Sequence, residues 1–154
     1  MAFFYNRGLR EVLAGNKNLS SATVKFMLVT NTYTPNHDHE FVSFGSGDPA
    51  SSELSVTNYV SGFSGAGRKT LSAGNMVFTT EHANDRVVFD YIADLLWSAL
   101  GGSATIQAGI IVLNGTTDAD TFPFIYVDLA SPVVTNGGDF TFQFNVSGVA
   151  RVTT

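Results

Sequence analysis

The sequence predicts an all-β fold: an antiparallel β-sandwich or jelly-roll-like single domain with a short N-terminal helix. Several short stretches alternate between apolar and polar residues with the period of two that is typical of a strand. Turn signals rich in glycine and asparagine separate these stretches. The length of 154 residues suits one domain, and a content of 44% hydrophobic residues excludes a disordered chain.

Only the beginning of the chain has helical spacing. Within residues 6–15, apolar side chains recur at positions i, i+3 and i+4, and Gly15 is suited to capping the end of a helix. We therefore divide the chain into an N-terminal helical or docking segment, residues 1–20, and a β-sandwich domain, residues 21–154.

The remaining pattern predicts strands. The stretch 105–113 is apolar on both faces, which is typical of a central strand that is covered on both sides. Pro123 lies near the start of its stretch, where a missing backbone donor is tolerated. The predicted strands are residues 22–30, 86–92, 105–113, 122–129, 140–146 and 149–152.

The stretch 140–146 has the clearest alternation. Phe140, Phe142, Phe144 and Val146 point to one side, and polar residues point to the other. Burying each phenylalanine ring contributes about 2–3 kcal/mol. A slip of one residue would turn all of these rings toward water, so the pattern specifies the register strongly.

The segment 92–100 is ambiguous. Its isoleucine and leucines have helical spacing, yet the segment directly follows a predicted strand and contains Trp97. We interpret it as a short helix or an irregular turn.

Charge and composition exclude several classes of function. The formal net charge is −5, divided into +3 for residues 1–25 and −8 for the remainder. An acidic body repels phosphate, so we predict no nucleic-acid partner. No stretch approaches the roughly 20 apolar residues that cross a bilayer, so we predict no membrane partner. The absence of cysteine excludes a disulfide scaffold and thiol catalysis. The first residues lack the apolar core of a signal peptide, which indicates a reducing cytoplasm.

A glycine-rich segment, residues 62–70, nearly matches a phosphate-binding P-loop. That motif needs Gly-Lys-Thr in direct succession at the start of a helix, whereas here Arg68 separates the glycine from the lysine. The residues that follow do not favour a helix. We interpret the segment as a glycine-rich β-hairpin or loop.

The sequence His37-Asp38-His39-Glu40 resembles a metal cluster within the long polar connection 31–52. In an extended chain the two histidines project to one side, which supplies two ligands where a tight zinc site needs three or four. We interpret this stretch as an exposed polar loop and predict no metal site.

Other polar groups give no catalytic pattern. His82 and Asp85 lie near many serines, but a hydrolytic triad is recognised by geometry and not by composition. Asp118 and Asp120 lack the regular acid spacing of a calcium loop and predict a solvated turn. We predict no catalytic residue and no cofactor, and a protein that is not an enzyme.

Several phrases of the sequence, taken in order, resemble a family of small virion structural proteins of tailed bacteriophages. They are YNRGLR at 5–10, VKFMLV at 24–29, YTPNHDHEF at 33–41, GFSGAGRKTL at 62–71, ANDRVVFD at 83–90 with Trp97 soon after, and VTNGGDFT at 134–141 leading to GVARV at 148–152. The resemblance spans most of the chain and consists of scaffold elements without a chemical signature.

The resemblance implies a capsid decoration (cement) protein that forms a homo-oligomer. Its partners would be the major capsid protein or other virion proteins, and it would reside in the virion after assembly in the host cytoplasm. One alternative is a component of the tail or of the head-to-tail interface. Another is a carbohydrate-binding module for host attachment, which would use exposed aromatic residues: Tyr33, Phe41, Phe44 and Tyr59.

The N-terminal segment mixes aromatic residues with arginine, as anchoring patches in interfaces do. We hypothesise that it docks on the capsid or on a neighbouring subunit; the alternative is that it only covers the open end of the sandwich. The candidate docking residues are Phe3, Phe4, Tyr5, Arg7, Leu9 and Arg10.

Overall fold

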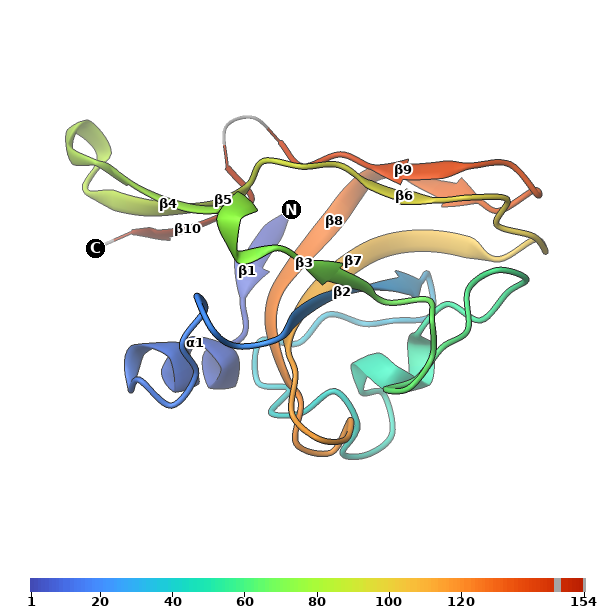
Figure 1. Cartoon of the computed structure of the whole chain (residues 1–154), viewed down its shortest axis with the longest axis horizontal. Helices are drawn as coiled ribbons and strands as arrows, with labels where there is room; N and C mark the ends of the chain where they lie inside the picture. The colour runs from blue at the N-terminus through green and yellow to red at the C-terminus, as the bar shows by residue number, and fades with distance from the viewer. Residues whose placement is uncertain (146–147, 154) are drawn as a thin grey trace.

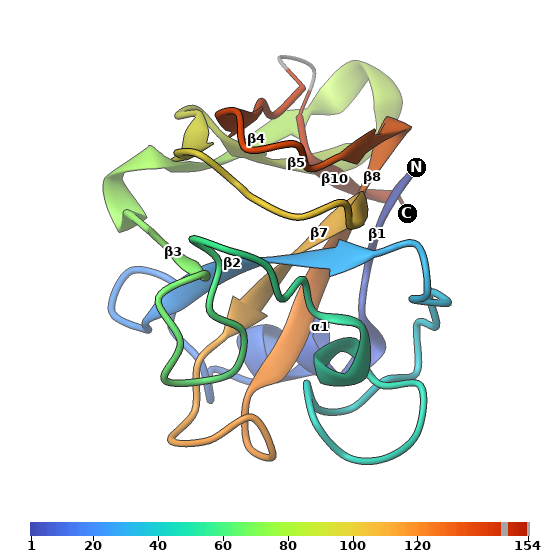
Figure 2. The ribbon, with the colours of Figure 1, turned by 90° about the vertical axis from the view of Figure 1, so that its right-hand side faces the viewer.

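The computed structural model describes residues 1–145 and 148–153 and confirms the all-β, sandwich-like fold. A five-stranded sheet with exclusively antiparallel neighbours forms the first layer (Figures 1 and 2). Its strands, in spatial order, are β1 (Ala2–Phe4), β8 (Phe122–Val134), β7 (Thr105–Leu113), β2 (Val24–Thr30) and β3 (Lys69–Leu71).

Two smaller sheets lie on the other side of the core. One pairs β6 (Leu95–Trp97) with β9 (Phe140–Phe142). The other is three-stranded and consists of β10 (Ala150–Thr153), β5 (Arg86–Tyr91) and β4 (Met76–Glu81), in that order. Figure 1 shows this three-stranded sheet extending beyond the body of the molecule. We call it the arm.

Short helices complete the fold. The helix α1 (Asn6–Leu13) confirms the helix expected near the N-terminus, and it lies against β8 because Gly8 approaches the backbone of Pro123 closely. Three 3-10 turns are η1 (Pro49–Ser52), η2 (Ala73–Asn75) and η3 (His82–Asn84). No helix in the described part of the chain is long and apolar enough to cross a bilayer.

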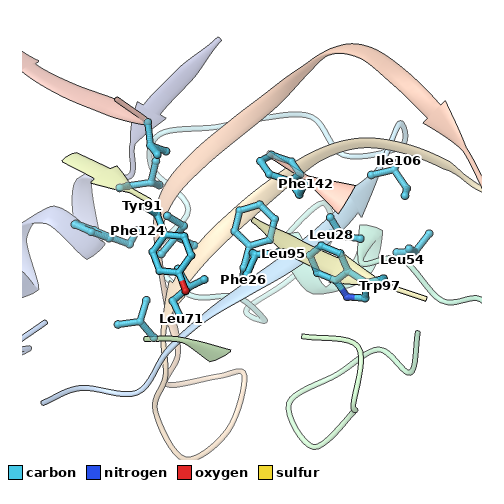
Figure 3. Packing of buried hydrophobic residues seen from close by; sticks show 14 of the residues in the cluster. Phe26, Leu28, Leu54, Leu71, Tyr91, Leu95, Trp97, Ile106, Phe124 and Phe142 are labelled. Carbon is cyan, nitrogen blue, oxygen red and sulfur yellow. The ribbon is translucent and has the colours of Figure 1, made fainter. Parts of the chain in front are cut away.

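Aromatic rings fill the core between the layers (Figure 3). The ring of Phe26 on β2 lies 4.6 Å from the ring of Phe142 on β9 and 6.2 Å from that of Trp97 on β6. Phe142 is 2% exposed, as the alternation in its stretch predicts. The Phe26 ring occupies the space beside Gly109 on β7, where a side chain is absent. A Cβ built on Gly109 would overlap that ring.

A second apolar cluster covers the opposite face of the five-stranded sheet. The long connection 31–52 contributes Tyr33 and Val42 to it, and β7 contributes Ile110. Both faces of β7 are therefore buried, which confirms the prediction of a central strand covered on both sides.

Several predicted boundaries change. β8 continues to Val134, beyond the predicted end at residue 129, because its last residues pair with Ile106 and Thr105 of β7. β9 ends at Phe142, although Phe144 still packs against the core. Val146, assigned to the same strand by the sequence, lies outside the described residues.

The prediction of a helix or irregular turn in residues 92–100 was wrong. Leu95 and Trp97 are buried while Leu96 is 50% exposed, which is the alternation of a strand. Backbone pairing of β6 with Phe140 and Phe142 of β9 outweighs the helical spacing of the leucines. The strands β1, β3 and β4 were not predicted.

Replacing Gly109 tests the central packing. We expect Gly109→Ala to lower the free energy of unfolding by about 1–3 kcal/mol, because the added methyl group forces Phe26 out of a packed position. Gly74→Ala is the control, since the nearest atom to its added Cβ lies 3.9 Å away, and it should change stability by less than about 0.5 kcal/mol. Denaturant unfolding measures both. Equal effects would contradict the assigned role of Gly109.

Candidate functional site

The glycine-rich segment 62–70 holds a buried arginine that pairs with two carboxylates. The side chain of Arg68 is fully buried, and its Nε and Nη2 donate to the two carboxylate oxygens of Glu53 over 2.9 and 2.7 Å. Its Nη1 and Nη2 also donate to Asp118. The segment is a loop that ends in β3, as the interpretation of a hairpin or loop allowed.

The remaining lone pairs of Glu53 are also used. Its Oε1 accepts a hydrogen bond from the hydroxyl of Tyr59, and its Oε2 accepts one from the backbone N–H of Gly62. Burial alone would lower the pKa of Arg68, but the hydrogen bonds to Glu53 and Asp118 outweigh burial and raise it. We call Arg68, Glu53, Asp118 and Tyr59 the ion cluster. It ties together three loops at one end of the sandwich.

The prediction of a solvated turn at both Asp118 and Asp120 was half wrong. Asp118 is 15% exposed because it faces Arg68. Asp120 closes the turn itself by accepting hydrogen bonds from the backbone N–H groups of Thr116 and Thr117, and these bonds hold the pKa of Asp120 well below its usual range.

The two histidines of the 37–40 stretch have different partners. The ring of His37 stacks on that of Phe3, with 3.9 Å between centroids. His39 Nδ1 lies 2.8 Å from the hydroxyl of Tyr33, which in turn lies 2.7 Å from the hydroxyl of Tyr5. Burial lowers the pKa of His39 and raises that of Tyr33 to about 12. Across the described residues, no group of three or more His, Cys, Asp or Glu could hold a metal ion.

Half of the N-terminal candidate residues lie inside the fold. Tyr5 is fully buried, and Phe4 and Leu9 are partly buried against the main core. The first strand pairs with β8, so this segment contributes to the sheet itself. A partner cannot contact Tyr5 directly without opening the fold.

The other half lies nearer the surface. Phe3 is half-buried by its stack with His37. Arg7 and Arg10 each form an ion pair with Glu11 over 2.9 Å, and the side chain of Arg10 is nevertheless 61% exposed. Docking through this segment therefore stays a prediction. Among its candidate residues, Arg10 has the most accessible side chain.

The aromatic residues considered for carbohydrate binding separate into two groups. Tyr33 and Tyr59 are 5% and 0% exposed, so the expectation that they lie at the surface was wrong. Their rings fill the core while their hydroxyls find partners in Tyr5 and Glu53. Phe41 is half-buried against Phe122, and Phe44 is 78% exposed.

The arm presents a surface of a different kind. Residues that pair directly across strands share a face, so one face of the arm holds only uncharged side chains. We call it the apolar face, and it comprises Met76, Phe78, Thr80, Val87, Phe89, Tyr91, Ala150 and Val152. The opposite face carries the charges of Glu81, Arg86, Asp90 and Arg151.

The apolar face is buried near the body and exposed beyond it. Phe89 is 1% exposed, and its ring packs against that of Phe124 on β8. Phe78, which pairs with Phe89 and whose ring lies 5.1 Å from the Phe89 ring, is still 51% exposed. Val87 and its partner Val152, one cross-strand position farther out on the same face, are 41% and 39% exposed. Figure 1 shows this outer half of the arm standing clear of the body. The arm thus carries an unpartnered apolar surface.

The sequence pattern predicts half of this surface. The alternation of residues 86–92 placed Val87, Phe89 and Tyr91 on one side of a strand. In β4, by contrast, Val77 and Phe78 are adjacent apolar residues, which obscures the period of two. The signal that could have found β4 is the run of strand-favouring residues between η2 and η3.

Replacing Arg68 tests the ion cluster. We expect Arg68→Met to lower the free energy of unfolding by about 3–5 kcal/mol, because two carboxylates lose their shared cation and one of them is fully enclosed. Arg68→Lys should rescue little, since an ammonium cannot bind two carboxylates in fork geometry. The exposed Arg10→Met is the control. A loss below about 1 kcal/mol for Arg68→Met in denaturant unfolding would refute the assigned role.

Comparison with known proteins identifies no relative: no family model, no curated protein and no solved structure matches the chain. The resemblance to bacteriophage virion proteins therefore stays a prediction.

Proposed function

We propose that this chain is a structural protein of the bacteriophage virion that decorates the capsid and acts through protein–protein contacts. One observation carries the proposal: the arm extends from the body and exposes a face without charged side chains. Contiguous apolar surface of this kind is typical of protein interaction sites.

The arm gains stability when it is covered. A small sheet in water depends on burial of its apolar face, and the outer half of this face is open. Covering the exposed half of Phe78 contributes about 1 kcal/mol, and Val87 and Val152 add to it. A capsid surface that covers the arm would provide this burial free energy at each copy of the protein on the particle.

The charges favour a protein as the partner. The chain carries a net charge of −5, which opposes binding to phosphate backbones. Contact through an uncharged face is also insensitive to salt, in contrast to contact through surface ion pairs. The partner of the arm is therefore an apolar patch on the major capsid protein.

A binding experiment with purified heads of the parent phage tests this function. We expect Phe78→Thr to reduce co-sedimentation with the heads at least about tenfold, because it removes the largest exposed ring of the apolar face but keeps a residue that favours strands. Wild-type binding should be unchanged between low and high salt.

Two variants serve as comparisons. Phe44→Thr removes an equally large ring that is 78% exposed elsewhere, and it should bind as the wild type does. Arg10→Glu tests docking through the N-terminal segment. Full binding by Phe78→Thr would overturn the role of the arm, and a single ring of copies per particle would favour the tail or head-to-tail alternative.

Carbohydrate binding for host attachment is the second candidate, and the exposure of Phe44 favours it. Asp48 holds the loop by accepting hydrogen bonds from the backbone N–H groups of Phe44, Gly45 and Ser51. The loop borders a hollow of about 240 Å³ that is also lined by His39 and Glu40. Such a hollow combines an apolar ring with polar groups, as sugar sites do.

A glycan array tests this second function. We expect any glycan retained by the wild type through this hollow to be lost by Phe44→Ala, while Phe78→Thr retains it. Glycan binding that persists in Phe44→Ala, or an array without any signal, would contradict the hypothesis of carbohydrate binding at this hollow.

A further inference from the structure

The strand β4 forms an open edge of the arm. It pairs with β5 on one side, and no strand within residues 1–145 and 148–153 pairs with its other side. Residues 77–80 are all exposed. An edge of this kind presents unpaired backbone groups that can pair with another strand.

The pairing pattern identifies which backbone groups face outward. The N–H of Ile92 donates to the carbonyl of Asn75, which marks this pair as a hydrogen-bonded position of the hairpin, although the N–H of Asn75 itself donates to Ser72. Antiparallel pairs alternate between bonded and non-bonded types, so the next bonded residues of β4 are Val77, Thr79 and Glu81. The N–H and carbonyl groups of Met76, Phe78 and Thr80 consequently point away from β5.

This edge lacks the features that usually prevent pairing. Natural edge strands carry proline, lysine, a bulge or a covering segment. β4 contains neither proline nor lysine, its register with β5 is continuous, and its single charge, Glu81, lies at one end. The strand is therefore suited to pairing and not protected against it.

We propose that β4 pairs antiparallel with β4 of a second copy of this chain, about a two-fold axis at Phe78. In this register Phe78 lies opposite the partner's Phe78, and Met76 lies opposite the partner's Thr80. All outward-facing groups of both strands are then satisfied, and the two three-stranded arms become one six-stranded sheet. This pairing deepens the proposed function, because it doubles the apolar face that docks on the capsid.

The charges are compatible with this register. On the other face, Glu81 lies opposite the partner's Asn75, and the two Glu81 carboxylates are six residues apart along the strands, or about 20 Å. That separation exceeds the Debye length of about 8 Å at physiological salt. On the apolar face, Phe78 meets the partner's ring as a cross-strand aromatic pair, which is a stabilising combination.

The mass of the isolated protein in solution tests the pairing without any particle. We expect sedimentation at about 100 μM to give twice the chain mass of 16.4 kDa. Thr80→Pro should give the single mass, because it removes an outward N–H and leaves the bonds to β5 intact. Thr80→Ala, which keeps the N–H, is the matched control. A wild type of single mass, or a dimeric Thr80→Pro, would overturn the proposal.

Engineered cysteines test the register and stay informative if the proline variant fails to fold. The chain has no cysteine of its own. The proposed register places Val77 opposite the partner's Thr79, within disulfide distance, and separates the two Thr79 residues by about 8 Å, beyond it.

We therefore expect Val77→Cys/Thr79→Cys to cross-link on oxidation and Thr79→Cys alone to remain uncross-linked. Cross-linking of Thr79→Cys alone would refute this register, and no cross-link in either variant would refute the pairing. A dimer that fails to bind heads would leave the pairing intact and remove the capsid function, so the two failures are distinguishable.

Discussion

The ion cluster is the contact that links three loops of this molecule to one another. Arg68 lies between the carboxylates of Glu53 and Asp118, which belong to loops far apart in the sequence. Closing a loop costs conformational entropy, although this cost grows only slowly with loop length. A shared buried cation changes that balance, because moving any one loop leaves an uncompensated charge in the interior. Three connections at one end of the sandwich thereby behave as one body.

The arm differs from the body in how much of its apolar surface is exposed. The body buries the rings of its core and pairs Arg68 with two carboxylates, whereas the arm leaves Phe78 and the edge of β4 uncovered. A chain that encloses Phe26, Trp97 and Phe142 has the apolar residues to cover such a surface. We therefore propose that another protein covers the exposed half of the arm.

The layers of the fold could be predicted from the sequence because they depend on local periodicity. A stretch that is apolar on both faces requires cover on both faces, as β7 has. The ion cluster could not, because Arg68 finds its partners 15 and 50 residues away and no periodicity links them. The strand β6 was missed because Leu96 is apolar yet exposed. The open edge of β4 follows from the order of strands in the sheet, and the pattern of a single sequence does not predict that order.

An uncovered sheet edge can pair with further chains and extend the sheet. In the arm, the position of the opposite edge strand limits this growth. β10, the strand at the far edge, lies beside β1 of the body, and β5 occupies the middle. Pairing between two β4 strands about a two-fold axis uses the β4 edge of the arm in each copy. Because an interface of this symmetry is closed, association ends at two chains and not in a fibre. The exposed β4 edge, which could otherwise cause aggregation, is then covered within a dimer of defined size.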